Sequence, residues 1–128
     1  MTLKKDIEER PDLERMLEIF YQKVFKDDLI SHFFTEVVPL NLETHIPVIA
    51  DFWESVLLDG RGYRKNVMEV HLNISEKSKI EKEHLDRWVK LFTETVDELF
   101  EGAKATLAKQ RAASIATMMH LKLSGNRL

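Results

Sequence analysis

The chain has 128 residues and a mass of 15.0 kDa, a length that suits one domain with a core large enough to enclose a ligand. Its 44% hydrophobic and 32% charged residues are typical of a soluble globular protein, and no apolar run approaches the roughly 18 residues that a membrane-spanning helix needs. The absence of cysteine excludes disulfides, thiolate nucleophiles and thiolate metal sites, so a bound metal would depend on histidine, carboxylate, tyrosine or a cofactor.

The formal net charge of -3 is distributed unevenly along the chain. No acidic residue follows Glu101 but five basic residues do, so the last segment carries +5 and the rest -8. These basic residues have no aromatic residues between them for base stacking, and cations toward the end of a last helix suit its dipole. We therefore expect no nucleic-acid partner and no membrane partner. The first residues include two lysines with no apolar stretch behind them, unlike a signal peptide, which predicts a cytoplasmic location.

Hydrophobic periodicity predicts a first helix over residues 12–26, with Pro11 where a first turn tolerates it. Residues 29–38 are short and densely apolar, which favours one or two helical turns. A second long helix is expected from about residues 41–44 to Leu58, with Pro47 within or one turn beyond its first turn. Tyr21 lies in the apolar stripe of the first of these helices and His45 in that of the second.

The second half of the chain predicts two further helices. Ser78 and Glu81 have the spacing of a capping box, and the apolar stripe that follows ends before Gly102, a natural stop. The last helix carries small apolar residues that would let a neighbour approach closely. No strand pattern or internal repeat is present. The sequence therefore predicts one all-α domain over residues 1–128, with residues 1–10 and 124–128 as frayed tails.

Residues 66–75 (NVMEVHLNIS) place His71 among apolar neighbours. Such a collar suits a nitrogen ligand to a buried metal, and it equally suits a hydrogen-bonded core histidine. Three other polar side chains, Tyr21, His45 and Trp88, occupy stripe positions where leucine would suffice. If they face one centre opposite His71, they have the chemistry needed around an iron porphyrin, because neutral donors would stabilise a bound diatomic ligand that takes up negative charge.

Other metal or phosphate sites fit the sequence less well. A carboxylate di-iron site needs two Glu-x-x-His motifs, and the chain offers one, Glu81 with His84, which we interpret as a solvated surface pair. Neither a His-Glu-x-x-His motif nor a phosphate-binding glycine loop is present. Arg61, Arg64 and Lys65 precede His71 in a basic loop, which is either simply solvated or placed to meet haem propionates.

Taken together, these segments resemble the truncated haemoglobins, and within that family group III. The resemblance is carried by IFYQKV with Phe20 and Tyr21, LETHIPVIADFWESVLL with His45, MEVHLNI with His71, HLDRWVKLFTETVDELFEG with Trp88, and AKQRAASIATMM. They occur in order from about residue 12 to residue 121. The resemblance implies a truncated globin fold, a two-over-two helical sandwich around haem b.

The resemblance also implies roles for particular residues. His71 corresponds to the proximal iron ligand, and Tyr21, Trp88 and His45 correspond to the polar residues of the distal, ligand-binding side. Phe33 corresponds to the phenylalanine that packs on the porphyrin. Further haem contacts are expected at Phe20, Ile49, Phe52, Trp53, Arg64, Met68 and Met119. The loop RKNVM before His71 departs from the glycine- and proline-containing turn of the family.

The sequence thus predicts a haem protein that binds oxygen, nitric oxide and carbon monoxide at iron. Donation from Tyr21 and Trp88 would slow ligand release, which suits nitric oxide dioxygenation or peroxide turnover with an unidentified reductase better than bulk transport. His45 would gate access, donate when protonated, or bind iron. The alternative is a non-catalytic helical interaction module without a cofactor, in which Tyr21, His45 and Trp88 are plain core.

Overall fold

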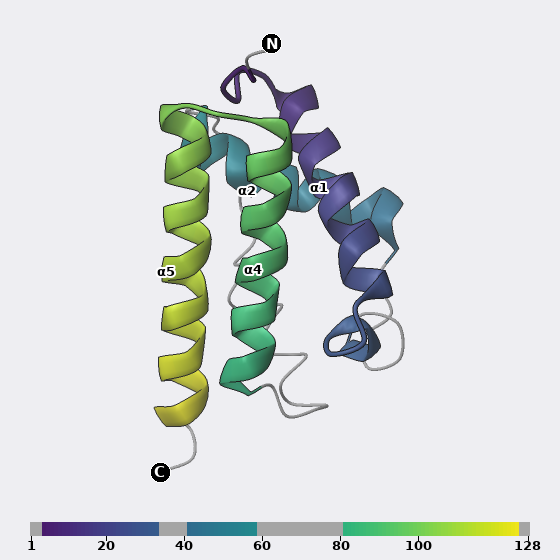
Figure 1. Ribbon diagram of the computed structural model, residues 1–128, viewed down its shortest axis with the longest axis vertical. Coiled ribbons are helices and arrows are strands. Elements are labelled where there is room, and N and C mark those ends of the chain that lie inside the picture. The colour runs from purple at the N-terminus through teal and green to yellow at the C-terminus, as the bar shows by residue number, and fades with distance from the viewer. Residues whose placement is uncertain (1–3, 34–40, 59–80, 126–128) are drawn as a thin grey trace.

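The protein consists of two packed pairs of helices (Figure 1). The computed structural model describes residues 4–33, 41–58 and 81–125, the last four through their backbone only. The long helices in these ranges are α1 (Arg10–Lys26), α2 (Leu42–Leu57), α4 (Lys82–Leu99) and α5 (Ala103–Gly125). α1 packs on α2 and α4 packs on α5, and the pairs meet where α1 contacts α4 and α2 contacts α5. No helix in these ranges is long and apolar enough to cross a membrane.

Side chains at the start of α1 hold its first turn. Glu9 is the N-cap residue, and Pro11 lies in the first turn. The Asp12 carboxylate accepts hydrogen bonds from the backbone N–H groups of Glu8 (3.0 Å) and Glu9 (3.1 Å). Burial raises the pKa of Asp12, but these N–H donors and the Lys5 ammonium lower it by more, so the net pKa is below the ordinary value.

The segment before α1 is anchored to α5, although the sequence predicts a frayed tail there. Ile7 is 1% exposed and belongs to the core. The Asp6 carboxylate accepts hydrogen bonds from the backbone N–H groups of Lys104 and Ala105, each at 2.9 Å. These N–H groups belong to the first turn of α5, where no helical carbonyl can satisfy them. Asp6 therefore caps a helix that begins almost a hundred residues later.

α2 begins after Asn41, whose side-chain oxygen accepts from the Glu43 N–H at 2.9 Å. Pro47 lies inside this helix rather than in its first turn. Its carbonyl accepts a hydrogen bond from Arg10 at 3.0 Å, and the same guanidinium pairs with Asp51. The N-terminus of α1 is thereby tied to α2 at the proline.

α4 begins with a different capping box from the predicted one. Ser78 lies outside the described residues, and Glu81 is itself the N-cap, donating its N–H to Nδ1 of His84 at 2.8 Å. The predicted solvated pair of Glu81 and His84 is therefore wrong. The His84 side chain is only 14% exposed, and its ring lies edge-on to Phe33 at a centroid distance of 4.9 Å.

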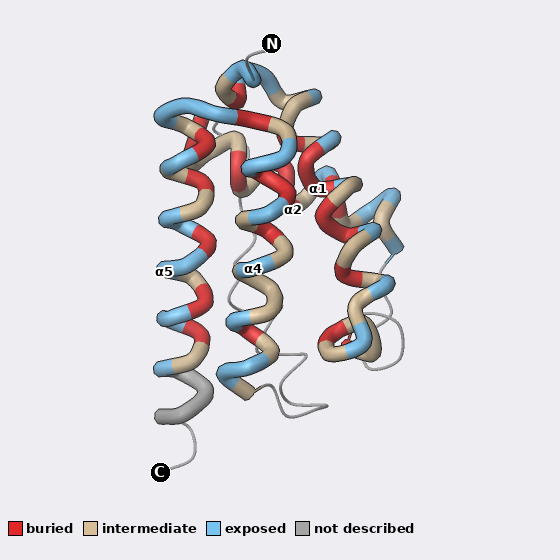
Figure 2. The backbone as a smooth tube through the Cα atoms, viewed as in Figure 1, coloured by how far each residue is buried: buried red, intermediate tan, exposed pale blue. Residues whose placement is uncertain are grey.

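The core lies where the four helices face one another. α5 contributes mainly small side chains, and Figure 2 shows buried residues recurring along its side next to α4, with exposed residues on the outer side. This is the close approach that the alanines of the last predicted helix indicate. The buried residues of α5 are Ala105, Ala108, Ala112, Ala116 and Met119.

Candidate functional site

A partly buried hydrogen bond joins α1 to α2. The hydroxyl oxygen of Tyr21 lies 2.7 Å from Nε2 of His45, and the two rings are nearly perpendicular, with centroids 5.1 Å apart. Tyr21 is 5% exposed and His45 is half-buried. Burial raises the pKa of Tyr21 above the ordinary value of a phenol. The hydroxyl therefore keeps its proton, and its capacity to donate, throughout the neutral pH range.

The direction of this hydrogen bond depends on the tautomer of His45. If Nε2 carries no hydrogen, the Tyr21 hydroxyl donates to it and its hydrogen is used. If Nε2 carries the hydrogen, His45 donates to the Tyr21 oxygen, and the hydroxyl hydrogen is left to reach a second acceptor. The pair thus presents a neutral donor to a ligand when His45 is protonated at Nε2.

An aromatic cluster connects this pair to Trp88. Phe20 lies edge-on to Tyr21 at 5.0 Å and to Trp88 at 6.0 Å between ring centroids. Trp88 stacks on Phe92 at 6.0 Å, and Phe92 stacks on Trp53 at 5.0 Å. Side chains from α1, α2 and α4 therefore meet in one aromatic wall. Phe92 is not among the predicted site residues, although its place four residues after Trp88 on one helix face would have identified it.

The other predicted site residues are placed as follows. Ile49 is buried on α2 and Phe52 is half-buried beside it, while Met119 is buried on α5. Phe33 is buried against His84 and belongs to the same hydrophobic core as the aromatic cluster. The structure brings Tyr21, His45 and Trp88 to one region, the first two in direct contact. Arg64, Met68 and His71 lie outside the described residues.

Asp27, just after α1, ties the end of that helix to α4. Its carboxylate accepts from the backbone N–H of Leu29 at 3.0 Å and from the Arg87 guanidinium at 2.7 Å, and its side chain is 9% exposed. Burial raises the pKa of Asp27, but Arg87 and the backbone donors lower it by more, so the net pKa lies below the ordinary value. Because Arg87 immediately precedes Trp88, this ion pair fixes the turn of α4 that carries the indole.

Comparisons with known proteins agree with this architecture. The chain is 28% identical over 108 residues to the group 3 truncated haemoglobin ctb of Campylobacter jejuni, a match that covers 82% of this chain and 83% of that protein. The crystal structure of the group III truncated haemoglobin from Campylobacter jejuni matches with a TM-score of 0.80 at 25% identity, covering 94% of this chain and 95% of that one. The chain is similar to the group III truncated haemoglobins in both sequence and fold. The predicted resemblance to group III and the predicted truncated globin fold are both confirmed. No family model matches the sequence.

The described residues of this protein fit a haem group by their chemistry. Similarity to the truncated haemoglobins supports a globin-type haem protein. Tyr21, His45 and Trp88 offer a phenol, an imidazole and an indole without a fully charged side chain among them, next to the aromatic wall. Among the residues that the structure describes, no group of three or more histidines and carboxylates could hold a metal ion by itself. These residues therefore suit the surroundings of a cofactor better than a side-chain metal centre.

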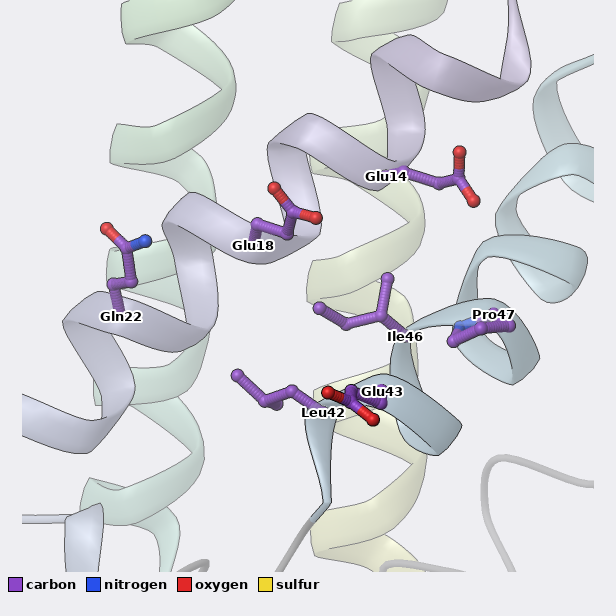
Figure 3. Close-up of a pocket in the computed structure, with 7 residues that line it drawn as sticks. All are labelled: Glu14, Glu18, Gln22, Leu42, Glu43, Ile46 and Pro47. Atoms are coloured by element: carbon purple, nitrogen blue, oxygen red, sulfur yellow. The ribbon is translucent and has the colours of Figure 1, made fainter.

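A groove of about 410 Å³ lies between α1 and α2 (Figure 3). Leu42 and Ile46 project into the space between the two helices and form its apolar floor. Glu14 and Glu18 from α1 and Glu43 from α2 supply three carboxylates around it. The groove lies over the helix pair that the Tyr21–His45 hydrogen bond joins.

Proposed function

We propose that this protein is a truncated haemoglobin that holds haem b through His71 and binds oxygen, nitric oxide and carbon monoxide on the opposite side, beside Tyr21 and Trp88. Haem would supply the iron at which such a diatomic ligand binds. The observation that best supports the proposal is the partly buried Tyr21–His45 hydrogen bond of 2.7 Å. It holds a neutral donor in a mostly aromatic environment, which a core packing role alone does not require.

In this proposal the chain's own residues act by hydrogen bonding. The Tyr21 hydroxyl donates to the ligand, while His45 donates from Nε2 to the Tyr21 oxygen and so orients the hydroxyl. The Trp88 N–H is a second donor. A hydrogen bond to a ligand that carries negative charge contributes about 1.5 to 3 kcal/mol, which slows ligand release by roughly ten- to a hundredfold or more.

Slow release determines which physiological roles fit. A protein that holds its ligand tightly is poorly suited to bulk oxygen transport. It suits redox chemistry on the ligand, of the nitric oxide dioxygenase or peroxidase type, with electrons from a separate reductase. We therefore propose oxygen and haem binding as the primary property and redox turnover as its use.

The haem assignment is tested by purifying the protein after expression with a haem supply. A Soret band is expected, and His71→Ala should alter or abolish it because the proposed iron ligand is removed. The alternative, a helical interaction module without a cofactor, predicts a colourless protein whose thermal stability is the same with and without added haem. A colourless protein, or an unaltered spectrum in His71→Ala, would contradict the proposal.

The donor role of Tyr21 is tested by oxygen dissociation measured in stopped flow. Tyr21→Phe should release oxygen about ten- to a hundredfold faster, because one charge-assisted hydrogen bond is lost. Tyr63→Phe removes the chain's other tyrosine hydroxyl and serves as the matched control, with an unchanged rate expected. An unchanged rate in Tyr21→Phe would move the donor role to Trp88 or His45.

His45 is tested separately, because its proposed role acts through Tyr21. His45→Leu removes the donor to the Tyr21 oxygen, so oxygen release should accelerate, whereas His45→Gln retains an N–H donor and should preserve part of the slow release. Combining His45→Leu with Tyr21→Phe should add little to Tyr21→Phe alone. Fully additive effects would show that His45 contacts the ligand independently.

A further inference from the structure

The groove between α1 and α2 combines an apolar floor with an unbalanced negative rim. Ile46 is 7% exposed and Leu42 is half-buried, so the floor is accessible only from within the groove. Glu14 lies 3.6 Å from Arg10, but Glu18 and Glu43 form no ion pair with any residue of the described ranges. A partner for this groove would therefore carry apolar side chains together with positive charge.

The outer face of α5 has the complementary composition. Arg111, Ser114, Met118 and Leu121 follow one another at steps of three and four residues and are all exposed, so they form one stripe along the helix. Met118 is 52% exposed and Leu121 is 64% exposed. Figure 2 shows that this side of α5 points away from α4. The stripe belongs to the segment after Glu101, which carries +5 with no acidic residue.

The two surfaces also match in length. Glu14, Glu18 and Gln22 line the groove at one-turn intervals along α1, a row of about 12 Å at 1.5 Å per residue. The stripe from Arg111 to Leu121 extends about 15 Å by the same rise. A helix lying in a groove between two others, with apolar anchors one to two turns apart, is a common mode of protein recognition.

We propose that the groove between α1 and α2 of one molecule receives the outer face of α5 from a second copy of this chain. Met118 and Leu121 cover Leu42 and Ile46, and Arg111 lies near the carboxylates of the rim. The contact is small, so it is weak and depends strongly on salt. It joins two different surfaces and is therefore heterologous, so a pair of molecules keeps one free groove and one free stripe at which further copies can add. The inference is independent of the haem proposal.

The test uses sedimentation velocity on the full-length protein and on two variants that each lack one surface. Glu18→Lys with Glu43→Lys blocks the groove, and Met118→Ser with Leu121→Ser blocks the stripe. All four residues are exposed, Met118 by 52% and Leu121 by 64%. Glu94→Lys with Glu101→Lys makes the same charge change at exposed positions elsewhere and serves as the control. Circular dichroism melting verifies that each variant is folded.

In about 0.02 M salt the average mass of the wild-type protein and of the control should rise with concentration from 15.0 kDa, and in about 0.5 M salt both should remain monomeric. Each blocked variant alone should remain monomeric at both salt concentrations. Mixing the two blocked variants should restore association and stop it at a one-to-one complex, because the mixture contains one intact groove and one intact stripe per pair. A monomeric wild-type protein in low salt, a control as impaired as the groove variant, or a mixture that stays monomeric would overturn the proposal.

Discussion

Asp6 offers a sharp test of how the ends of the chain are joined. Asp6→Ala removes the acceptor for the backbone N–H groups of Lys104 and Ala105, and α5 has no acidic residue of its own in its first turn. Loss of an N-cap acceptor costs about 0.5 to 2 kcal/mol, and loss of the favourable interaction with the helix dipole costs about 0.3 to 1 kcal/mol more. The expected decrease in the free energy of unfolding is about 1 to 3 kcal/mol, equivalent to roughly 4 to 12 °C in Tm.

The effect should depend on pH with a definite sign. Burial raises the pKa of Asp6, but the backbone donors of Lys104, Ala105 and Ile7 lower it by more, so its net pKa in the folded protein is below the ordinary value. A carboxyl whose pKa falls on folding contributes stability above its unfolded pKa of about 3.9. That stability is lost as the pH falls through the folded pKa. The difference between wild type and Asp6→Ala should therefore be full at pH 7 and shrink in acid.

Chemical denaturation at several pH values measures both quantities. Asp6→Asn is the matched variant, because it keeps one acceptor oxygen and the shape of the side chain while removing the charge. It should lose less stability than Asp6→Ala, with little pH dependence remaining. A change of less than about 0.3 kcal/mol in Asp6→Ala at pH 7, below the range for a lost cap, would refute the capping role.

Two further predictions concern the contact of Asp6 with Gly102 and the contacts of Asp27. Gly102→Ala should lower the free energy of unfolding by about 1 to 3 kcal/mol, since Gly102 has a φ of +144° and an added Cβ would lie 2.5 Å from Cγ of Asp6. In a double-mutant cycle its effect should not add to that of Asp6→Ala, and simple additivity would contradict the clash. Asp27→Asn should cost about 1 kcal/mol at pH 7, with the loss fading in acid because the pKa of Asp27 is lowered in the folded state. It should also shift the Trp88 resonance in fluorotryptophan NMR and leave that of Trp53 unchanged; equal shifts would show a general loosening instead.

Local signals were sufficient to predict most helix bodies. The predicted first helix over residues 12–26 agrees with α1, which begins two residues earlier at Arg10 and ends at Lys26. The second helix begins at Leu42, within the predicted range of residues 41–44, and ends at Leu57, one residue before the predicted end, while the pattern allows Pro47 either within the first turn or beyond it. These features depend on residues three or four apart, so the hydrophobic periodicity of the sequence predicts them.

Features that depend on distant residues could not be predicted. Asp6 is an ordinary acidic residue in the sequence, and its role arises because the fold brings it to α5, 98 residues away. The stripe positions of Tyr21 and His45 were evident, but their 2.7 Å hydrogen bond requires the crossing of α1 and α2. The capping box at Glu81 was missed because a histidine accepts there instead of a carboxylate or amide. The roles proposed for Arg64, Met68 and His71 stay predictions, as does the cytoplasmic location.

The alanines on the inner side of α5 also have a consequence for how this protein can change over generations. Ala105, Ala108, Ala112 and Ala116 set the spacing of two helices by the absence of side chains rather than by their shape. A leucine at Ala105, Ala108 or Ala112, each at most 2% exposed, has no space to enter unless a facing residue becomes smaller at the same time. No single substitution of these alanines by a much larger residue should therefore be tolerated, whereas substitution by glycine or serine should be. In a saturation library the seam should stand out as a periodic row of intolerant sites, while the opposite side of the same helix accepts nearly any polar residue.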